Sequence, residues 1–219
     1  MLNSDVSAAP DASLAPGSWE QDAVGAHPLQ SVVAAGVLLD VARVLTGLLG
    51  VVRPEVGART ERVTQLVRHV VGVLDVDGPW EFEVAARLSQ IGWLTLPPET
   101  AAAVMRGEAL EDEQWRAVAS HPLIARDLLS DVQRLTGPRE MIARQREPFL
   151  APGETPTPWH RRDRLALGGQ ILRVCAEYDE LRQRGQAPDQ ALAVLAACPR
   201  EFDSALVDVI ARAAAKHSG

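Results

Sequence analysis

The stretch that decides the fold class runs from residue 63 to residue 74 and reads Val-Thr-Gln-Leu-Val-Arg-His-Val-Val-Gly-Val-Leu. Its apolar residues recur at intervals of three and four, which places their side chains on one face of an α-helix. They are Val63, Leu66, Val67, Val70, Val71 and Leu74. No segment of the chain alternates apolar and polar residues as a half-buried strand does. The helical spacing recurs over residues 82–88, 123–129, 165–181, 192–195 and 202–210. The sequence therefore predicts an all-α fold of roughly eight to ten helices.

Chain length and turn signals indicate one folded domain with a tail. The 219 residues, of which 47% are hydrophobic, are enough for one sizeable core but not for two full domains. Residues 1–28 are rich in Ala, Ser and Pro without apolar periodicity and are predicted to form a flexible N-terminal tail. Residues 29–219 are predicted to form a single helical domain. The proline-rich segment 148–158 is a loop within that domain, because similar amphipathic helices lie on both sides of it.

Charge and cysteine content exclude several classes of function. The 22 basic and 29 acidic residues give a net charge of −7, which argues against nucleic acid as a partner. Cys175 and Cys198 lie in apolar helical contexts without metal-binding spacing, so we expect neither a disulfide framework nor a zinc site. The N-terminus lacks the basic and apolar regions of a signal peptide. These features predict a cytoplasmic protein.

The segment 29–52 is predicted to form a helix that is apolar nearly all round. Asp40 and Arg43 near its middle would each cost about 2.5 to 3.5 kcal/mol in a bilayer, so we do not expect it to insert into a membrane. Its apolar residues exceed what one helical stripe needs. We expect this helix to be buried or to pair with a second copy of the chain, as a dimer element.

Three other stretches carry motif-like residues in a fixed order. Residues 85–97 read Ala-Ala-Arg-Leu-Ser-Gln-Ile-Gly-Trp-Leu-Thr-Leu-Pro, and residues 110–125 contain Leu-Glu-Asp-Glu-Gln-Trp and then Ser-His-Pro-Leu-Ile-Ala. Residues 171–207 begin Ile-Leu-Arg-Val-Cys-Ala-Glu-Tyr-Asp-Glu-Leu and end Glu-Phe-Asp-Ser-Ala-Leu-Val. In order and spacing they resemble the HD-GYP branch of the HD phosphohydrolase superfamily. The family counterparts are a helix ending in His-Asp-Ile-Gly-Lys, a His-Pro-x-x-Gly motif and a Phe-Asp-Pro-x-Leu-Val motif.

The resemblance implies an HD-domain-like helical bundle and a bacterial signalling role. Members of the branch hydrolyse cyclic di-GMP with two divalent metals, which clustered His and Asp side chains hold so that a bridging water is polarised. The positions of the family's ligands and of its phosphate-contacting lysine fall on Arg59, Ser89, Gln90, Trp93, His121, Gln145, Arg146 and Ala176. Only His121 keeps the family residue. Arg59 and Arg146 would repel metal rather than recruit it. The resemblance therefore implies no catalytic residues, no metal ligands and no cofactor.

Three hypotheses about function follow from these departures. The first is a catalytically inactive HD-GYP-like module that binds a second copy of itself or another signalling protein. The second is a working cyclic di-GMP phosphodiesterase that holds two divalent metals with a non-standard ligand set. The third is a sensor that binds cyclic di-GMP or a related nucleotide through its arginines without hydrolysing it.

Individual side chains in these motifs have structural interpretations as well. His121 is expected at the start of a helix, because Pro122 favours the first helical turn. Trp93 is expected to fill the vacated metal pocket rather than to offer a stacking face to a ligand. Trp115 is expected to pack in the core.

A local basic patch follows the proline-rich loop. Arg161, Arg162 and Arg164 lie close together and are candidates for contact with phosphate or with an acidic partner. The alternative is a solvated helix start, in which Asp163 offsets part of the charge.

Overall fold

The computed structural model describes residues 28–216, and its regular secondary structure over that range is entirely helical. The α-helices are α1 (Pro28–Val52), α2 (Pro54–Leu74), α3 (Pro79–Leu88), α4 (Pro98–Met105), α5 (Asp112–Leu128), α6 (Thr136–Ala143), α7 (Arg164–Gln183), α8 (Pro188–Ala196) and α9 (Ser204–Lys216). Single turns of 3₁₀ helix are η3 (Ile91–Thr95), η4 (Gln133–Leu135), η5 (Arg144–Arg146) and η6 (Trp159–Arg161). The predicted all-α class and the predicted number of helices are confirmed for residues 28–216.

The chain divides into two compact units, residues 1–34 and 35–219. Of the first unit only residues 28–34 are described, as the beginning of α1. The predicted tail, residues 1–28, lies outside the described residues except for Pro28. The predicted boundary between tail and domain therefore stays a prediction.

Helix starts follow local sequence signals. Proline occupies the first helical position of α2, α3, α4 and α8, where its missing N–H costs nothing because that donor has no intrahelical acceptor. At the start of α7 the Asp163 carboxylate accepts hydrogen bonds from the backbone N–H groups of Leu165 and Ala166. At the start of α5 the Gln114 side chain accepts one from the backbone N–H of Glu111.

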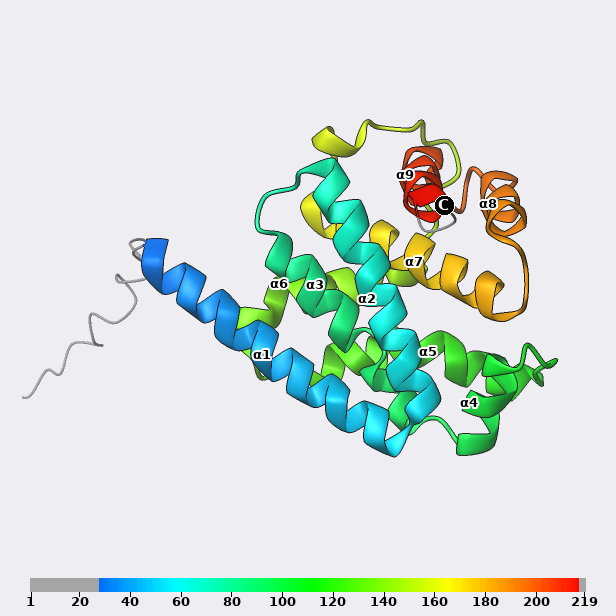
Figure 1. Cartoon of the computed structure of the whole chain (residues 1–219), viewed down its shortest axis with the longest axis horizontal. Helices are drawn as coiled ribbons and strands as arrows, with labels where there is room; N and C mark the ends of the chain where they lie inside the picture. Colours follow the sequence, from blue (N-terminus) through cyan, green and yellow to red (C-terminus); the bar gives the residue numbers. More distant parts are fainter. Residues whose placement is uncertain (1–27, 217–219) are drawn as a thin grey trace, which may run out of the picture. The chain divides into compact units, whose positions relative to one another are not determined.

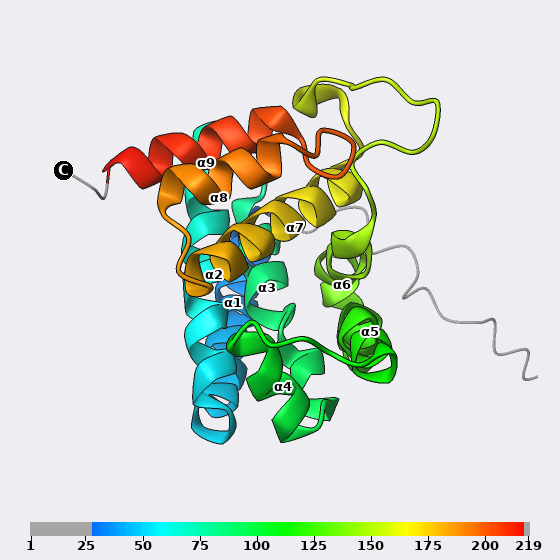
Figure 2. The same ribbon diagram turned by 90° about the vertical axis from the view of Figure 1, so that its right-hand side faces the viewer.

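The larger of two apolar clusters joins α2 and α3 to α6, α7, α8 and α9. It contains the predicted stripe of α2, of which Val63, Val67 and Val70 are almost fully buried. Figures 1 and 2 show α7 running between α8 and α9 on one side and α3 and α6 on the other. Two glycines let α7 approach its neighbours closely, because a Cβ at Gly168 would meet Met141 and one at Gly169 would meet Arg144.

The second cluster lies at the other end of α2. Its buried members are Leu49, Val56, Trp93, Leu96, Ala101, Val104 and Val118, which come from α1, α2, η3, α4 and α5. The segment η3 lies so close to α5 that a Cβ at Gly92 would stand 2.0 Å from the carbonyl oxygen of His121. A glycine is therefore required at position 92, and it brings η3 and its tryptophan against His121.

Within unit 35–219, one side of α1 packs on the helical body and the other is exposed. Leu38 and Ala42 contact the larger cluster, and Leu49 belongs to the second. By length and composition the stretch Val33–Val52 could also cross a membrane, with a mean hydropathy of 1.9 over 20 residues. Within the structure 11% of this stretch is buried, and Ala42 and Leu49 are among its buried residues.

Candidate functional site

The positions that the family resemblance singled out come together in one place. Arg59 is on α2, Ser89 and Gln90 follow α3, and Trp93 is in η3. His121 is on α5, and Ala176 is on α7. Gln145 and Arg146 are in η5. These segments surround a cavity of about 90 Å³ whose wall includes Arg59, Gln90, His121, Gln145, Arg146 and Ala176.

Arg59 is the buried charge of this site. Its side chain is 6% exposed and lies 3.7 Å from Asp179 and 3.4 Å from Glu180, both on α7. It also donates hydrogen bonds to Gln90 Oε1 (3.3 Å) and to the carbonyl oxygen of Ala176 (3.3 Å). A buried guanidinium needs such compensation, since removing one partner of a buried pair typically costs about 3–5 kcal/mol. The ring of Trp93 lies 5.7 Å from the guanidinium carbon and adds a cation–π contact.

Ser89 and Gln90 continue this network inward. Gln90 Nε2 donates to Ser89 Oγ at 2.9 Å, and Ser89 Oγ donates to the carbonyl oxygen of Ala86 at 2.8 Å. The hydrogen bonds thus run in one direction, from Arg59 through Gln90 and Ser89 to the α3 backbone. Both side chains are at most 1% exposed. Ser89 and Gln90, which the resemblance aligns with the family's His-Asp pair, therefore belong to a hydrogen-bonded buried network, which makes the local fold specific.

His121 lies within α5 and not at a helix start, so that expectation is wrong. Pro122 is accommodated inside the helix because the His121 side chain supplies the hydrogen bond to the carbonyl group that Pro122, which lacks an N–H, cannot make. Pro122 has no N–H for Val118 O, and His121 Nδ1 lies 2.7 Å from that oxygen instead. This contact places the ring proton on Nδ1 and leaves Nε2 as a lone pair.

Burial holds His121 neutral. It lowers the pKa of the imidazole from 6.5 to about 4, against the Val118 hydrogen bond, and the positive charges of Arg59 and Arg146 lower it further. His121 Nε2 and Gln145 Nε2 are both buried without a hydrogen-bonding protein partner, and both residues line the cavity. The cavity wall therefore carries one unused acceptor and one unused amide donor.

Trp93 is 2% exposed and lies in the second apolar cluster. Its ring packs at a tilt against His121, with 5.2 Å between the ring centroids. Both faces are therefore occupied by protein, and neither is available for stacking on a ligand.

The expectation that Trp115 packs in the core is wrong. It is 47% exposed on α5, so it does not pack in the core, because the helix turns this position toward solvent.

Three charged residues of the cavity wall were missed by sequence reasoning. Arg173, Glu177 and Glu180 on α7 face the same cavity. Burial and the nearby Glu180 carboxylate raise the pKa of Glu177 above its ordinary value. These residues are spaced by four and then three positions, which places them on one side of a helix. This spacing is the feature of the sequence that could have identified them.

The basic patch does not stay together as one surface. The side chain of Arg162 is 8% exposed, lies over the Phe149 ring and pairs with Asp203 at 2.5 Å. Arg164 pairs with Glu81 at 3.1 Å and donates to the carbonyl groups of Asp77 and Gly78 at the start of α3. Arg161 alone of the three is exposed. Two of the three arginines predicted to contact phosphate or an acidic partner are thus engaged in ion pairs within the domain.

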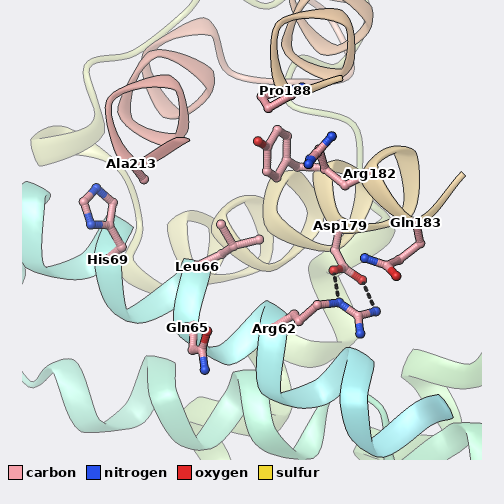
Figure 3. Close-up of a pocket in the computed structure, with 10 residues that line it drawn as sticks. Arg62, Gln65, Leu66, His69, Asp179, Arg182, Gln183, Pro188 and Ala213 are labelled. Carbon is pink, nitrogen blue, oxygen red and sulfur yellow. Dashed lines mark hydrogen bonds and ion pairs between the residues drawn. The ribbon is translucent and has the colours of Figure 1, made fainter. Parts of the chain in front are cut away.

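A larger cavity, about 630 Å³, is lined by residues that include Arg62 and Asp179 (Figure 3). Its wall comes from α2, α7, the start of α8 and Ala213 of α9, with Leu66 and Pro188 as apolar residues and Arg182 as a basic one. Asp179 accepts two hydrogen bonds from Arg62, at 2.6 and 3.1 Å. This carboxylate, 3% exposed, therefore joins Arg59 and Arg62 of α2 to α7.

Comparison with protein families agrees with this geometry. The family model described as HD domain matches residues 43–206, which is most of the chain. The chain therefore belongs to the HD domain family, and the expected kinship with HD phosphohydrolases is confirmed at that level. No curated protein matches the chain.

Proposed function

We propose that this protein is a catalytically inactive HD domain of the HD-GYP type, which acts in cytoplasmic signalling by binding other molecules. The observation that supports the proposal best is the buried guanidinium of Arg59. The family resemblance assigns Arg59 to the position of a metal ligand, and its side chain is held by Gln90, Ala176 and Glu180. A fixed cation there opposes the binding of divalent metals, and HD hydrolases need such metals to activate water.

The donor set at the cavity also does not fit a binuclear metal centre. Ser89 and Gln90 are engaged with each other, and Ala176 offers no ligand atom in its side chain. Over residues 28–216, no group of three or more His, Cys, Asp or Glu side chains is arranged to hold a metal ion. His121 Nε2 is the one imidazole lone pair on the wall of this cavity.

The alternative function is a cyclic di-GMP phosphodiesterase with unusual ligands. Its best candidates are His121 together with the carboxylates of Glu177 and Glu180. Glu180 already binds Arg59 and, at 2.6 Å, Arg184. A metal would have to displace these cations from the carboxylate, which counts against the alternative.

Hydrolysis of cyclic di-GMP by the purified full chain tests the choice, with Mn²⁺ or Fe²⁺ added. We expect background rates for the native chain, for His121→Ala and for the control His160→Ala, whose histidine is exposed and distant in sequence. Turnover that is lost in His121→Ala and kept in His160→Ala would establish the phosphodiesterase instead.

A second candidate function is recognition of a phosphate group at the same cavity. Arg59, Arg146 and Arg173 line it against two glutamates, and Gln145 Nε2 is a buried donor without a protein partner. The cavity of about 90 Å³ is smaller than the roughly 300 Å³ or more that a whole drug-sized ligand needs. A nucleotide could therefore insert only a phosphate, with its bases outside.

Thermal unfolding with inorganic phosphate and with cyclic di-GMP tests this second candidate. Binding should raise the unfolding temperature of the native chain and of Arg161→Ala, the exposed control, and should have less effect on Arg146→Ala. An unchanged unfolding temperature with both compounds would leave protein binding as the function.

A further inference from the structure

The exposed side of α1 carries a regular apolar seam. Its residues are Val37, Val41, Val44, Leu48 and Val51, which are 50% to 81% exposed. They are spaced by four, three, four and three residues, the heptad spacing at which one helix packs against another. The residues of α1 that pack on the body, Ala42 and Leu49, lie roughly a third of a turn away. The seam is therefore not used for packing within residues 35–213.

We propose that this seam is the interface of a homodimer, in which α1 pairs with α1 of a second copy in antiparallel orientation. The spacing of Val37, Val41, Val44 and Leu48 is self-complementary about the midpoint between residues 42 and 43. An antiparallel pair about that point places Val37 opposite Leu48 and Val41 opposite Val44 of the other copy. Each layer thus joins two apolar residues, as the two seam positions do in antiparallel coiled coils.

The charges of α1 favour this orientation over a parallel one. Asp40 and Arg43, the ionisable residues of the segment, lie together on one flank of the seam, 3.1 Å apart. In the antiparallel pair, Asp40 of each copy and Arg43 of the other lie on the same flank. They are offset along the helix axis by about two residues, which is about 3 Å. A parallel pair would set this flank against the opposite flank of the other copy, which carries Leu45 and Val52, so that no opposite charge would face Asp40 or Arg43.

The flank is also open enough for a second helix. Gly36 and Gly47 lie beside Asp40 and Arg43, and a Cβ built on either meets no atom within 4 Å. The midpoint between the two glycines is the same as the midpoint between Asp40 and Arg43, and it lies one residue from the midpoint of the seam. Small residues at these places let the backbones approach.

The seam, if fully covered, offers an area at the lower end of the range for specific protein interfaces. Full burial of a Val or Leu side chain contributes about 1.5–3 kcal/mol. At about 25 cal/mol per Å², this corresponds to about 60–120 Å² of apolar surface per side chain. Scaled by their exposure, the five seam residues with Leu45 and Val52 offer on the order of 400 Å² per copy. Two copies give on the order of 800 Å² of apolar area, which at about 65% apolar content corresponds to an interface of roughly 1,200 Å².

Analytical ultracentrifugation of the full chain at several concentrations tests the interface. We expect a dimer for the native chain and for Val194→Glu, which alters a comparably exposed valine on α8. Val44→Glu should be monomeric with unchanged helical content, because its side chain is 63% exposed in the monomer. A monomeric native chain, or a dimer that survives Val44→Glu, would overturn the proposal.

Mixed cross-linking tests the orientation. In a Cys198→Ser background, which removes the exposed native thiol, the variants Val37→Cys and Leu48→Cys are oxidised separately and as a mixture. The antiparallel pair predicts disulfide-linked dimers in the mixture and few in either variant alone. Dimers that form equally well in each variant alone would show a parallel pair and refute the register. Sedimentation of monomers with anionic lipid vesicles, lost in Val44→Glu, would assign the seam to a membrane and also refute it.

Discussion

Acidification should destabilise the fold through His121, and the size of the effect follows from its burial. The neutral imidazole is 6% exposed, and its pKa is about 4 instead of 6.5. Because the unfolded chain binds this proton more readily than the folded chain, stability falls as the pH drops below 6.5 and continues to fall to about pH 4. At 1.36 kcal/mol per pKa unit, the full loss is about 3 kcal/mol, of which about 2 kcal/mol is reached by pH 5.

The effect is measured as the difference between two proteins, because carboxylates titrate in the same range. Urea unfolding followed by far-ultraviolet circular dichroism at pH 7.5, 6, 5 and 4.5 gives the free energy of unfolding of the native chain and of His121→Asn. Asparagine can still donate to Val118 O but cannot take up a proton. We expect the free energy of the native chain to drop by about 2 kcal/mol more than that of the variant between pH 7.5 and 5. His160→Asn, at an exposed position, should follow the native chain, and equal slopes for His121→Asn and the native chain would refute the reasoning.

Other substitutions test the packing and the identity of the site. Trp93→Ala should lower the free energy of unfolding by about 3–5 kcal/mol in urea titrations, since it empties a buried indole site, and a loss below about 1 kcal/mol would mean that the ring is not core. Gly92→Ala should cost at least about 1–3 kcal/mol by the same assay because its Cβ would collide with the backbone of His121, whereas Gly72→Ala, with open space around it, should stabilise by about 0.5–1 kcal/mol. The double substitution Ser89→His and Gln90→Asp should not restore metal binding by isothermal titration with Mn²⁺, because Arg59 remains in place. Tight binding of two metals by that double variant would show that the remaining ligands lie elsewhere.

Local patterns in the sequence were sufficient for most of the fold. The apolar stripe of α2 and the prolines that begin α2, α3, α4 and α8 are properties of neighbouring residues, and each reports directly on a helix. Pro122 shows the limit of such signals. A proline in the first turn is the commoner arrangement, and the sequence alone does not reveal that His121 supplies a hydrogen bond to the carbonyl group that Pro122 leaves free.

The composition of the candidate site was predictable only in part. The family resemblance brought Arg59, Gln90 and His121 together, and the structure places all three on one cavity wall. The compensation of Arg59 by Asp179 depends on two residues that lie 120 positions apart, and such pairings leave no periodic signal. The same holds for Arg162 with Asp203. In both cases the charge of an arginine that the sequence marked as a candidate site residue is compensated by an internal ion pair.

The exposure of individual side chains was the least predictable property. The apolar composition of segment 29–52 indicated two faces to be covered, but not which residues the body would cover. Trp115 was expected in the core by analogy, and it is 47% exposed on α5. Burial depends on the relative placement of helices, which the periodicity within one helix does not determine.

The metal content of the purified protein is the most direct test of the central claim, that a buried arginine has replaced the metal centre of an HD domain. Full-length protein is purified without chelator, dialysed, and measured by inductively coupled plasma mass spectrometry against protein concentration. We expect fewer than about one tightly bound transition-metal ion per chain, because Arg59 and the amide side chains supply no ligand set for one. Two metal ions per chain, retained through dialysis and released by His121→Ala, would contradict the claim.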